Sequence, residues 1–191
     1  MAMVERDAEA TKRRLLDAAT AEFAAFGIAG ARVDRIATAA RSNKAQIYHY
    51  FDSKEGLFDA VFGAMAKDAA TGDYFDAADL AETAGRIFDS LESSPVAGRL
   101  SLWYRLERAG DARTISALSR ANEVKIAAIR AAQRAGEVTE SLPADALLGM
   151  ILMIASTWTA LPADLQDAST QDSPRARRDY VVEAVRRIVA P

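Results

Sequence analysis

The stretch VDRIATAARSNKAQIYHYFDSKEGL, residues 33–57, guides the interpretation of the whole sequence. Its apolar spacing predicts two short helices, at about 33–40 and 43–50, joined by a tight turn. Asn43 is a good N-cap for the second helix, because its side-chain oxygen can accept a hydrogen bond from a free amide of the first turn. Ser53 is placed to cap a further helix, and the glutamate two residues later suits the positive end of that helix dipole. We therefore expect three closely spaced helices here.

The end of the second helix carries five bulky side chains in a row. A helix turns once every 3.6 residues, so such a run covers its whole circumference. Ile47 and Phe51 lie four apart on one face, which suits a core, so Tyr48 and His49 must point elsewhere. Two lysines flank this run, Lys44 and Lys54. Rings with polar tips beside lysines predict a surface that contacts an anionic partner.

The rest of the chain also favours helix. Proline is sparse, long stretches are rich in Ala, Leu, Arg and Glu, and no alternating strand pattern is visible. In the first helix, Leu15, Ala19, Phe23 and Phe26 form an apolar stripe, and Gly27 or Gly30 can end it. We predict an all-α fold of about nine helices, at about 8–26, 33–40, 43–50, 54–70, 77–92, 96–109, 112–135, 143–160 and 174–189.

The segment 143–160 is apolar on almost every side. Its most apolar part, 146–161, is shorter than the ~20 residues that a membrane span needs, so a buried helix is the better interpretation. Such a helix must be covered on most sides, by its own domain or by a second subunit. The N-terminus has no apolar signal segment, because acidic residues interrupt it.

Composition excludes several classes of site. The chain has no cysteine, which excludes disulfides, thiolate metal sites and cysteine nucleophiles and fits a reducing cytoplasm. The single histidine, His49, leaves little for metal binding or acid–base chemistry. The net charge of −3 divides into +1 for residues 1–55 and −4 for the remainder, so whole-chain charge does not decide whether nucleic acid binds.

Residues 11–57 resemble the DNA-binding region of TetR-family transcriptional regulators. The matching motifs are Phe23 to Gly27, Ile36-Ala37, Tyr48 to Phe51, and Ser53-Lys54-Glu55 followed by Leu57. The close resemblance covers about a quarter of the chain, and the combination of motifs is specific. It implies an N-terminal three-helix helix-turn-helix DNA-binding domain and a larger helical domain for ligand binding and dimerisation. We place these domains at residues 1–52 and 53–191.

Several positions depart from the family pattern. The turn reads Ala40-Arg41-Ser42-Asn43 where Ala-Gly-Val-Ser is typical, so Arg41 replaces the glycine that eases the turn. Ala45 and Gln46 stand where Gly and Thr are common, and Arg32 stands where a Thr often caps the second helix. These departures concern base preference rather than DNA binding itself.

Helix-turn-helix modules lay their second helix in the major groove of DNA. Gln46 could pair with adenine and Lys44 with guanine. By resemblance, Tyr48, His49 and Lys54 hold phosphates, and the two arginines add to that grip. The predicted DNA-binding residues are Arg32, Arg41, Asn43, Lys44, Ala45, Gln46, Tyr48, His49 and Lys54. The alternatives are that Tyr48 or Tyr50 is a core ring and that Lys54 or Arg41 merely faces water.

For the larger domain the sequence supplies candidates but no signature. Aromatic, Met and polar side chains that could line a largely apolar ligand pocket are Phe62, Met65, Phe88, Trp103, Tyr104, Glu107, Met150, Met153 and Trp158. The alternative for each is ordinary packed core. We assign the helices at 143–160 and 174–189 to a homodimer interface, which the resemblance implies is a four-helix bundle.

The resulting hypothesis is a ligand-responsive regulator, most commonly a repressor, that binds a palindromic operator in double-stranded DNA as a dimer. A small molecule would release it by favouring a conformation in which the helix at 54–70 has tilted. No Gly-rich phosphate loop, H-E-x-x-H motif or Ser/His/Asp set suggests an enzyme, and we expect no cofactor or metal. The alternative is a helical small-molecule-binding protein without specific DNA binding.

Overall fold

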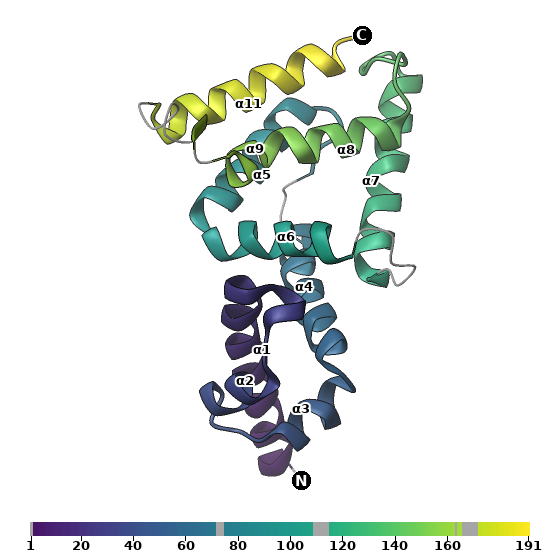
Figure 1. The fold of residues 1–191 in the computed structure, drawn as a ribbon. Helices are drawn as coiled ribbons and strands as arrows, with labels where there is room; N and C mark the ends of the chain where they lie inside the picture. The colour runs from purple at the N-terminus through teal and green to yellow at the C-terminus, as the bar shows by residue number, and fades with distance from the viewer. Residues whose placement is uncertain (1, 72–74, 109–114, 163, 166–171) are drawn as a thin grey trace. The chain divides into compact units, whose positions relative to one another are not determined.

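The computed structural model describes residues 2–71, 75–108, 115–162, 164–165 and 172–191. Within these ranges every regular element is a helix, which confirms the all-α prediction (Figure 1). The helices are α1 Ala2–Gly30, α2 Val33–Ala39, α3 Lys44–Phe51, α4 Lys54–Thr71, α5 Leu80–Ser93, α6 Pro95–Glu107, α7 Ser116–Arg134, α8 Ala144–Ala155, α9 Thr157–Ala160 and α11 Pro174–Val189. The predicted start of a helix near 112 lies outside the described residues.

Two compact units divide the chain. The first joins residues 1–66 to 99–115, and the second joins 67–98 to 116–191. The segment 99–107 of α6 therefore packs with the N-terminal helices, far from it in sequence. The division after residue 52 that the sequence suggests stays a prediction, because a contact-based unit and a functional domain need not share a boundary.

Helix α1 is longer than predicted and is bent. It starts at Ala2 rather than near residue 8, and Gly27 interrupts it with φ 68° and ψ −176°. Only glycine adopts a positive φ without a steric penalty, so the chain can bend there and then form one more turn. The predicted stop signal at Gly27 is thus the position of the bend.

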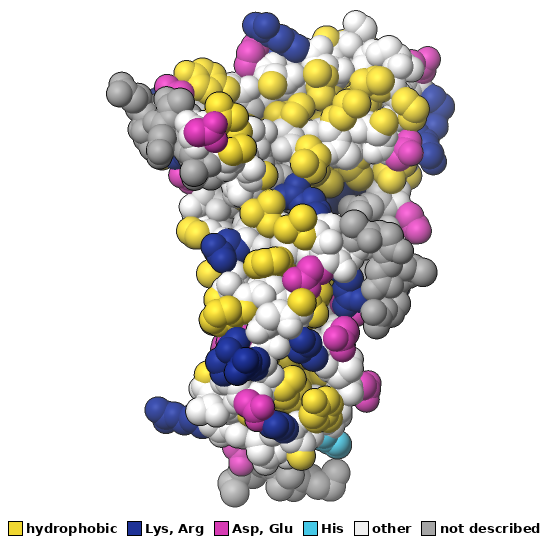
Figure 2. Space-filling view, viewed as in Figure 1, with side chains coloured by type: hydrophobic (Ala, Val, Ile, Leu, Met, Phe, Trp, Pro, Cys, Tyr) yellow, Lys and Arg dark blue, Asp and Glu magenta, His cyan; other side chains and the backbone are white. Residues whose placement is uncertain are grey.

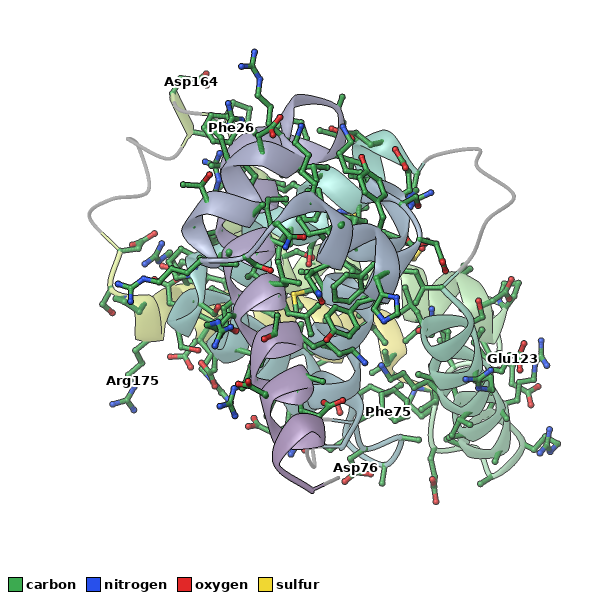
Figure 3. All side chains as sticks on the ribbon, turned by 90° about the horizontal axis from the view of Figure 1, so that it is seen from below. Phe26, Phe75, Asp76, Glu123, Asp164 and Arg175 are labelled. Atoms are coloured by element: carbon green, nitrogen blue, oxygen red, sulfur yellow. The ribbon has the colours of Figure 1, made fainter. Side chains whose placement is uncertain are left out.

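The core of the first unit follows the predicted stripe of α1 with one exception. Leu15, Ala19 and Phe23 are fully buried, and the Phe23 ring meets the edge of Phe58 from α4 at 5.2 Å between centroids. Phe26 was expected on this stripe but is 48% exposed (Figure 3). The Arg35 guanidinium covers its ring at 4.3 Å from the centroid, which gives the exposed ring a partner.

The second unit is a layered helical bundle in which α5 packs against α8 and α11, while α7 packs against α8 (Figure 1). Its core is mostly aliphatic, with fully buried side chains at Ile129, Leu147, Ile151 and Val185. At the edge of this core, Arg178 of α11 forms ion pairs with two acids of α5, Glu82 at 2.5 Å and Asp89 at 2.8 Å.

The apolar helix predicted at 143–160 is two helices, α8 and α9, that meet at Ser156. Ser156, Thr157 and Thr159 each donate a hydroxyl hydrogen bond to a backbone oxygen three or four residues earlier. Such hydroxyls compete with backbone amides for the carbonyls of the helix. This competition explains why the helix breaks here, although the apolar composition predicts one helix up to residue 160. None of the described helices is both long and apolar enough to span a bilayer.

Candidate DNA-binding surface

The turn between α2 and α3 closes through short backbone and side-chain bonds. Asn43 caps α3 as predicted, because its Oδ1 accepts the Gln46 amide at 3.0 Å. Arg41 adopts φ 50°, the left-handed conformation that glycine favours. This conformation costs a non-glycine residue about 1–2 kcal/mol, so Arg41 carries local strain where a glycine would not. The amide of Ser42 donates to Ala37 at 2.9 Å and fixes the geometry.

Helix α3 divides into a buried face and an open face. Ile47 is fully buried and Phe51 nearly so, which anchors the helix. Tyr48 is 49% exposed and His49 is exposed, and the histidine appears at the surface in cyan (Figure 2). The alternative that Tyr48 is a core ring is therefore excluded, whereas Tyr50 is half-buried and contacts the neighbouring rings.

The other predicted α3 contacts differ in exposure. Lys44 and Ala45 are exposed at the first turn, and Gln46 is half-buried. The Lys44 ammonium forms an ion pair with Asp34 of α2 at 2.6 Å. The hydrogen bond and the charge of Asp34 raise the pKa of Lys44. The lysine therefore stays charged, and it already has an anionic partner within the protein.

Lys54, predicted to hold a phosphate, lies half-buried at the start of α4. Its ammonium donates to the backbone oxygens of Ala29 and Ala31, both at 3.3 Å. The alternative that it is simply a solvated lysine is therefore excluded. The positive charge of Lys54 stabilises these carbonyls at the end of α1. A DNA phosphate that binds Lys54 would have to share its ammonium with them.

Arg32 and Arg41 are exposed, as the prediction of DNA contacts requires.

The backbone amide of Arg32 donates to Glu22 at 2.9 Å, and Arg35 donates to the same carboxylate. Although burial acts to raise it, the pKa of Glu22 is lowered overall by these hydrogen bonds and by the arginine charges. Sequence reasoning missed Glu22 and Arg35, because nothing in their spacing marks a pair thirteen residues apart on different helices.

The bend of α1 receives polar side chains from α6. Arg99 and Trp103 both donate to the Ala24 oxygen, at 2.7 and 3.3 Å, and Glu107 accepts the Ala29 amide at 3.0 Å. A Cβ on Gly27 would come within 2.8 Å of the Trp103 ring. Trp103 and Glu107, predicted as walls of a ligand pocket, thus hold the end of α1 in this structure.

The remaining pocket candidates fall into separate groups. In the first unit, Phe62 is buried and stacks on Tyr104 at 4.3 Å between centroids, with Met65 half-buried nearby in sequence. In the second unit, Phe88 is buried and meets the edge of Trp158 at 6.0 Å. The two methionines of α8, Met150 and Met153, are 43% and 52% exposed.

Two further polar groups of the second unit lie in unusual surroundings, the indole N–H of Trp158 and the ammonium of Lys125. The indole N–H of Trp158 is buried, and no described residue accepts a hydrogen bond from it. Lys125 of α7 lies with its ammonium 5.9 Å from the centre of the Phe75 ring, and burial lowers its pKa. A lone lysine in an amphipathic helix gives no sequence signal for such a position.

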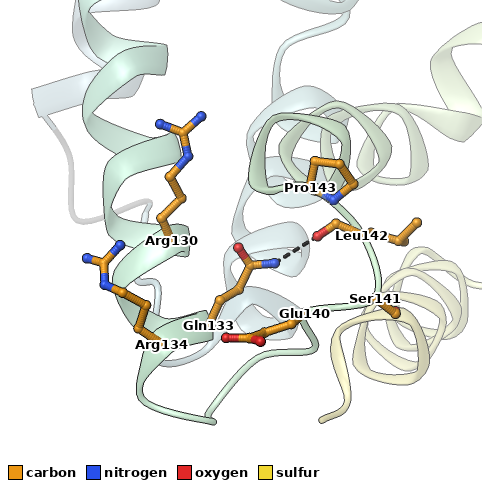
Figure 4. Close-up of a pocket in the computed structure, with 7 residues that line it drawn as sticks. All are labelled: Arg130, Gln133, Arg134, Glu140, Ser141, Leu142 and Pro143. Carbon is orange, nitrogen blue, oxygen red and sulfur yellow. Dashed lines mark hydrogen bonds between the residues drawn. The ribbon is translucent and has the colours of Figure 1, made fainter.

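A shallow hollow also opens where α7 meets the loop before α8 (Figure 4). It is lined by Arg130, Gln133, Arg134, Glu140, Ser141, Leu142 and Pro143. The Gln133 amide donates to the backbone oxygens of Thr139 and Leu142, both at 2.8 Å, so it fastens the loop. None of the predicted pocket residues lines this hollow.

Comparison with known proteins extends the resemblance over most of the chain. Residues 15–61 match the family described as "Bacterial regulatory proteins, tetR family", and residues 79–187 match "Tetracyclin repressor-like, C-terminal domain". The chain is 37% identical to the HTH-type transcriptional repressor SCO4008 of Streptomyces coelicolor, over 98% of this chain and 99% of the relative.

Solved structures agree with this relationship. The transcriptional regulator SCO4942 from Streptomyces coelicolor is 38% identical, with a TM-score of 0.78, over 94% of this chain and 98% of that one. FadR from Bacillus subtilis, solved in complex with stearoyl-CoA, shares the fold at a TM-score of 0.63 and 19% identity, over 93% and 98% of the two chains. On the domain matches and the full-length relative together, this chain belongs to the TetR family of transcriptional regulators.

Proposed function

We propose that this chain is a cytoplasmic transcriptional repressor that binds a palindromic operator as a homodimer and leaves it when a small molecule binds. The observation that carries the proposal is the division of α3, in which Ile47 and Phe51 anchor the helix while Lys44, Tyr48 and His49 stay exposed. An anchored helix with an outward polar face is what major-groove binding requires. The similarity to SCO4008, which is named a repressor, supports the direction of regulation.

The proposed contacts separate base reading from backbone gripping. Gln46 and Lys44 read base edges, where one well-formed pair discriminates by about 1–3 kcal/mol. Tyr48, His49 and Lys54 hold phosphates. The exposed Arg32 and Arg41, the cap residue Asn43 and the exposed Ala45 complete the contact surface. Phosphate contacts fix the register of the protein and make affinity depend on salt.

The dimer interface is proposed at α8 and α11. Exposed apolar side chains gather over this part of the second unit, in yellow in Figure 2, and include Met150, Met153 and Tyr180. A Cβ at Gly149 would meet no atom within 4 Å, so a second helix can approach α8 closely there. A two-fold dimer places two α3 helices on one palindrome, about 34–36 Å apart.

The effector is proposed to be largely apolar and to bind the larger domain, with a hydrogen-bond acceptor facing Trp158. A buried donor without an acceptor is unfavourable, so the indole N–H would gain from a ligand oxygen. FadR, solved with stearoyl-CoA, is a protein of this fold that binds a ligand with a long acyl chain, which supports this proposal. Helix α4 begins in one unit and ends in the other, so a ligand that favours one tilt of α4 changes the spacing of the two recognition helices.

The test is binding of the purified chain to a duplex that it selects from a random library. Replacing Tyr48→Ala together with Lys44→Gln should weaken binding at least tenfold, while Arg134→Gln, an exposed charge of α7, should have little effect. An unchanged affinity for the double variant would contradict the proposed surface.

The alternative is a helical ligand-binding protein without specific DNA binding. It draws support from Lys44 and Lys54, since both already have partners inside the protein. A steep fall of affinity for random duplex DNA with rising salt favours the regulator, because only phosphate contacts release counterions.

A further inference from the structure

The ion pair between Asp34 and Lys44 joins the two helices of the DNA-binding motif at their exposed side. Asp34 belongs to the first turn of α2, and Lys44 is the first residue of α3. The atoms Asp34 Oδ1 and Lys44 Nζ lie 2.6 Å apart, and the side chains are 69% and 55% exposed. Lys44 and the exposed Tyr48 lie four residues apart, so they share one face of α3. The carboxylate therefore stands at the proposed DNA-contacting face.

Two features hold this carboxylate in place. The first turn of a helix favours an acidic side chain, because the free amides there carry partial positive charge. Lys44 supplies a full positive charge from the other side. An anion held in this way opposes the approach of DNA phosphates, and it occupies the lysine that would otherwise attract them.

We propose that Asp34 is a specificity-determining residue, which competes with DNA for Lys44 and so penalises binding to unmatched sequences. On random DNA, Lys44 can bind only a phosphate, and it must break its ion pair with Asp34 to do so. On a matched site, guanine O6 and N7 accept from Lys44 in the groove, so the lost ion pair is offset. This inference rests on the proposed contact between Lys44 and a base.

We expect this ion pair to contribute little to the free energy of unfolding, so a mutation that removes it can change DNA binding without unfolding the protein. Exposed ion pairs add little to stability, since solvent screens them and ordering two side chains opposes them. Asp34→Asn keeps the size of the residue and removes its charge, so it loses the exposed ion pair and the favourable interaction of an acid with the helix start. A thermal melt followed by circular dichroism should therefore fall only slightly below that of the wild type.

The experiment measures affinity by fluorescence anisotropy for two duplexes, one selected by the protein from a random library and one of random sequence. For Asp34→Asn, we expect about two- to fivefold tighter binding to the random duplex. The slope of log affinity against log salt should steepen by about 0.9, because Lys44 becomes available to one more phosphate. Affinity for the selected duplex should change less, so the ratio of the two affinities should fall.

Two controls identify the cause. Asp17→Asn removes an exposed acid from α1 of the same unit and reports the effect of net charge alone. In a Lys44→Gln background, Asp34→Asn should tighten random binding less than it does in the wild type, because the lysine that it releases is gone. A smaller effect in that background is the signature of competition for Lys44.

Several results would overturn the inference. One is an equal gain from Asp34→Asn and Asp17→Asn, and another is an equal gain on both duplexes. If Lys44→Gln leaves the selected duplex bound as tightly as before, the proposed base contact fails and takes the inference with it. If Lys44→Gln weakens binding but Asp34→Asn changes nothing, the contact stands and only the role of Asp34 is wrong.

Discussion

The exposed face of α3 and the bent end of α1 belong to the same unit and differ in how their polar groups are bonded. Among the described residues, the α3 face makes one ion pair, from Lys44 to Asp34. The bent end of α1 instead receives side chains from three other helices, including Arg35 of α2, Lys54 of α4 and Trp103 of α6. The bend leaves backbone groups without helical partners, and these must be satisfied.

The difference shows which part of the first unit is held by bonds within the protein and which part is available to a partner. The carbonyls and amides near Gly27 are satisfied inside the protein, so changes there should act on folding. The side chains on the exposed face of α3 point outward, so changes to them should act on DNA binding and leave folding almost unaltered, whereas the Asn43 cap bonds to the backbone of α3 and should act on folding. Four predictions test this separation.

The largest expected effect is that of Gly27→Ala. The positive φ of 68° strains any other residue, and the new Cβ would clash with Trp103 and Glu107. Together these effects should lower the free energy of unfolding by about 2–4 kcal/mol. Thermal or urea melts measure the loss. Gly30→Ala, where φ is not positive and the closest atom is Phe26 Cβ at 3.3 Å, is the matched control.

Next in size is Gln46→Ala, which should act only on binding. Its amide group is the proposed partner of an adenine, and removal should cost about 1–3 kcal/mol of binding free energy at that base. Its backbone amide still donates to Asn43, so the melt should not change. Affinities for the selected duplex and for single-base variants of it measure the effect. A lower melting temperature with unaltered base preference would contradict the separation of roles.

A smaller effect is expected for Asn43→Ala, which removes the cap of α3. The loss of one capping bond typically lowers stability by about 1 kcal/mol. Asn43→Ser preserves an acceptor at this position and should restore most of the stability. Comparing the melting temperatures of the two variants isolates the cap, and equal losses would show that the cap contributes nothing.

The smallest effect concerns Glu22 and acid. The pKa of Glu22 is lower in the folded protein than its ordinary value of 4.5, so its contribution to stability is complete above that value. The contribution is lost as pH falls through the folded pKa. Melts of the wild type and of Glu22→Gln should therefore differ most near neutral pH and converge once the pH lies below the folded pKa of Glu22. A constant difference at all pH values would contradict this.

The local structure around α3 in the first unit could be predicted from the sequence, because it depends on residues that are close together along the chain. The Asn43 cap and the burial of Ile47 and Phe51 each depend on residues within one or two turns. The exposure of Tyr48 follows from the same periodicity.

The features that sequence did not predict depend on partners far along the chain. Trp103 bonds to Ala24, 79 residues away, and no spacing rule encodes that pairing. Phe26 has the right spacing for the core, yet the bend one residue later turns it outward. The break of α8 depends on hydroxyls whose preference for backbone acceptors outweighs the apolar composition around them.

The placement of the two tryptophans has a practical consequence. Trp103 lies in the first unit and Trp158 in the second, so each unit carries its own intrinsic fluorophore. The Trp103 indole N–H binds a backbone oxygen of α1, whereas Trp158 lies between the rings of Phe88 and Tyr180. Emission from a Trp158→Phe protein would follow the first unit alone, and emission from a Trp103→Phe protein would follow the second unit alone. Mixing each protein rapidly with an effector and following its emission over time would show which unit responds first, with no added label.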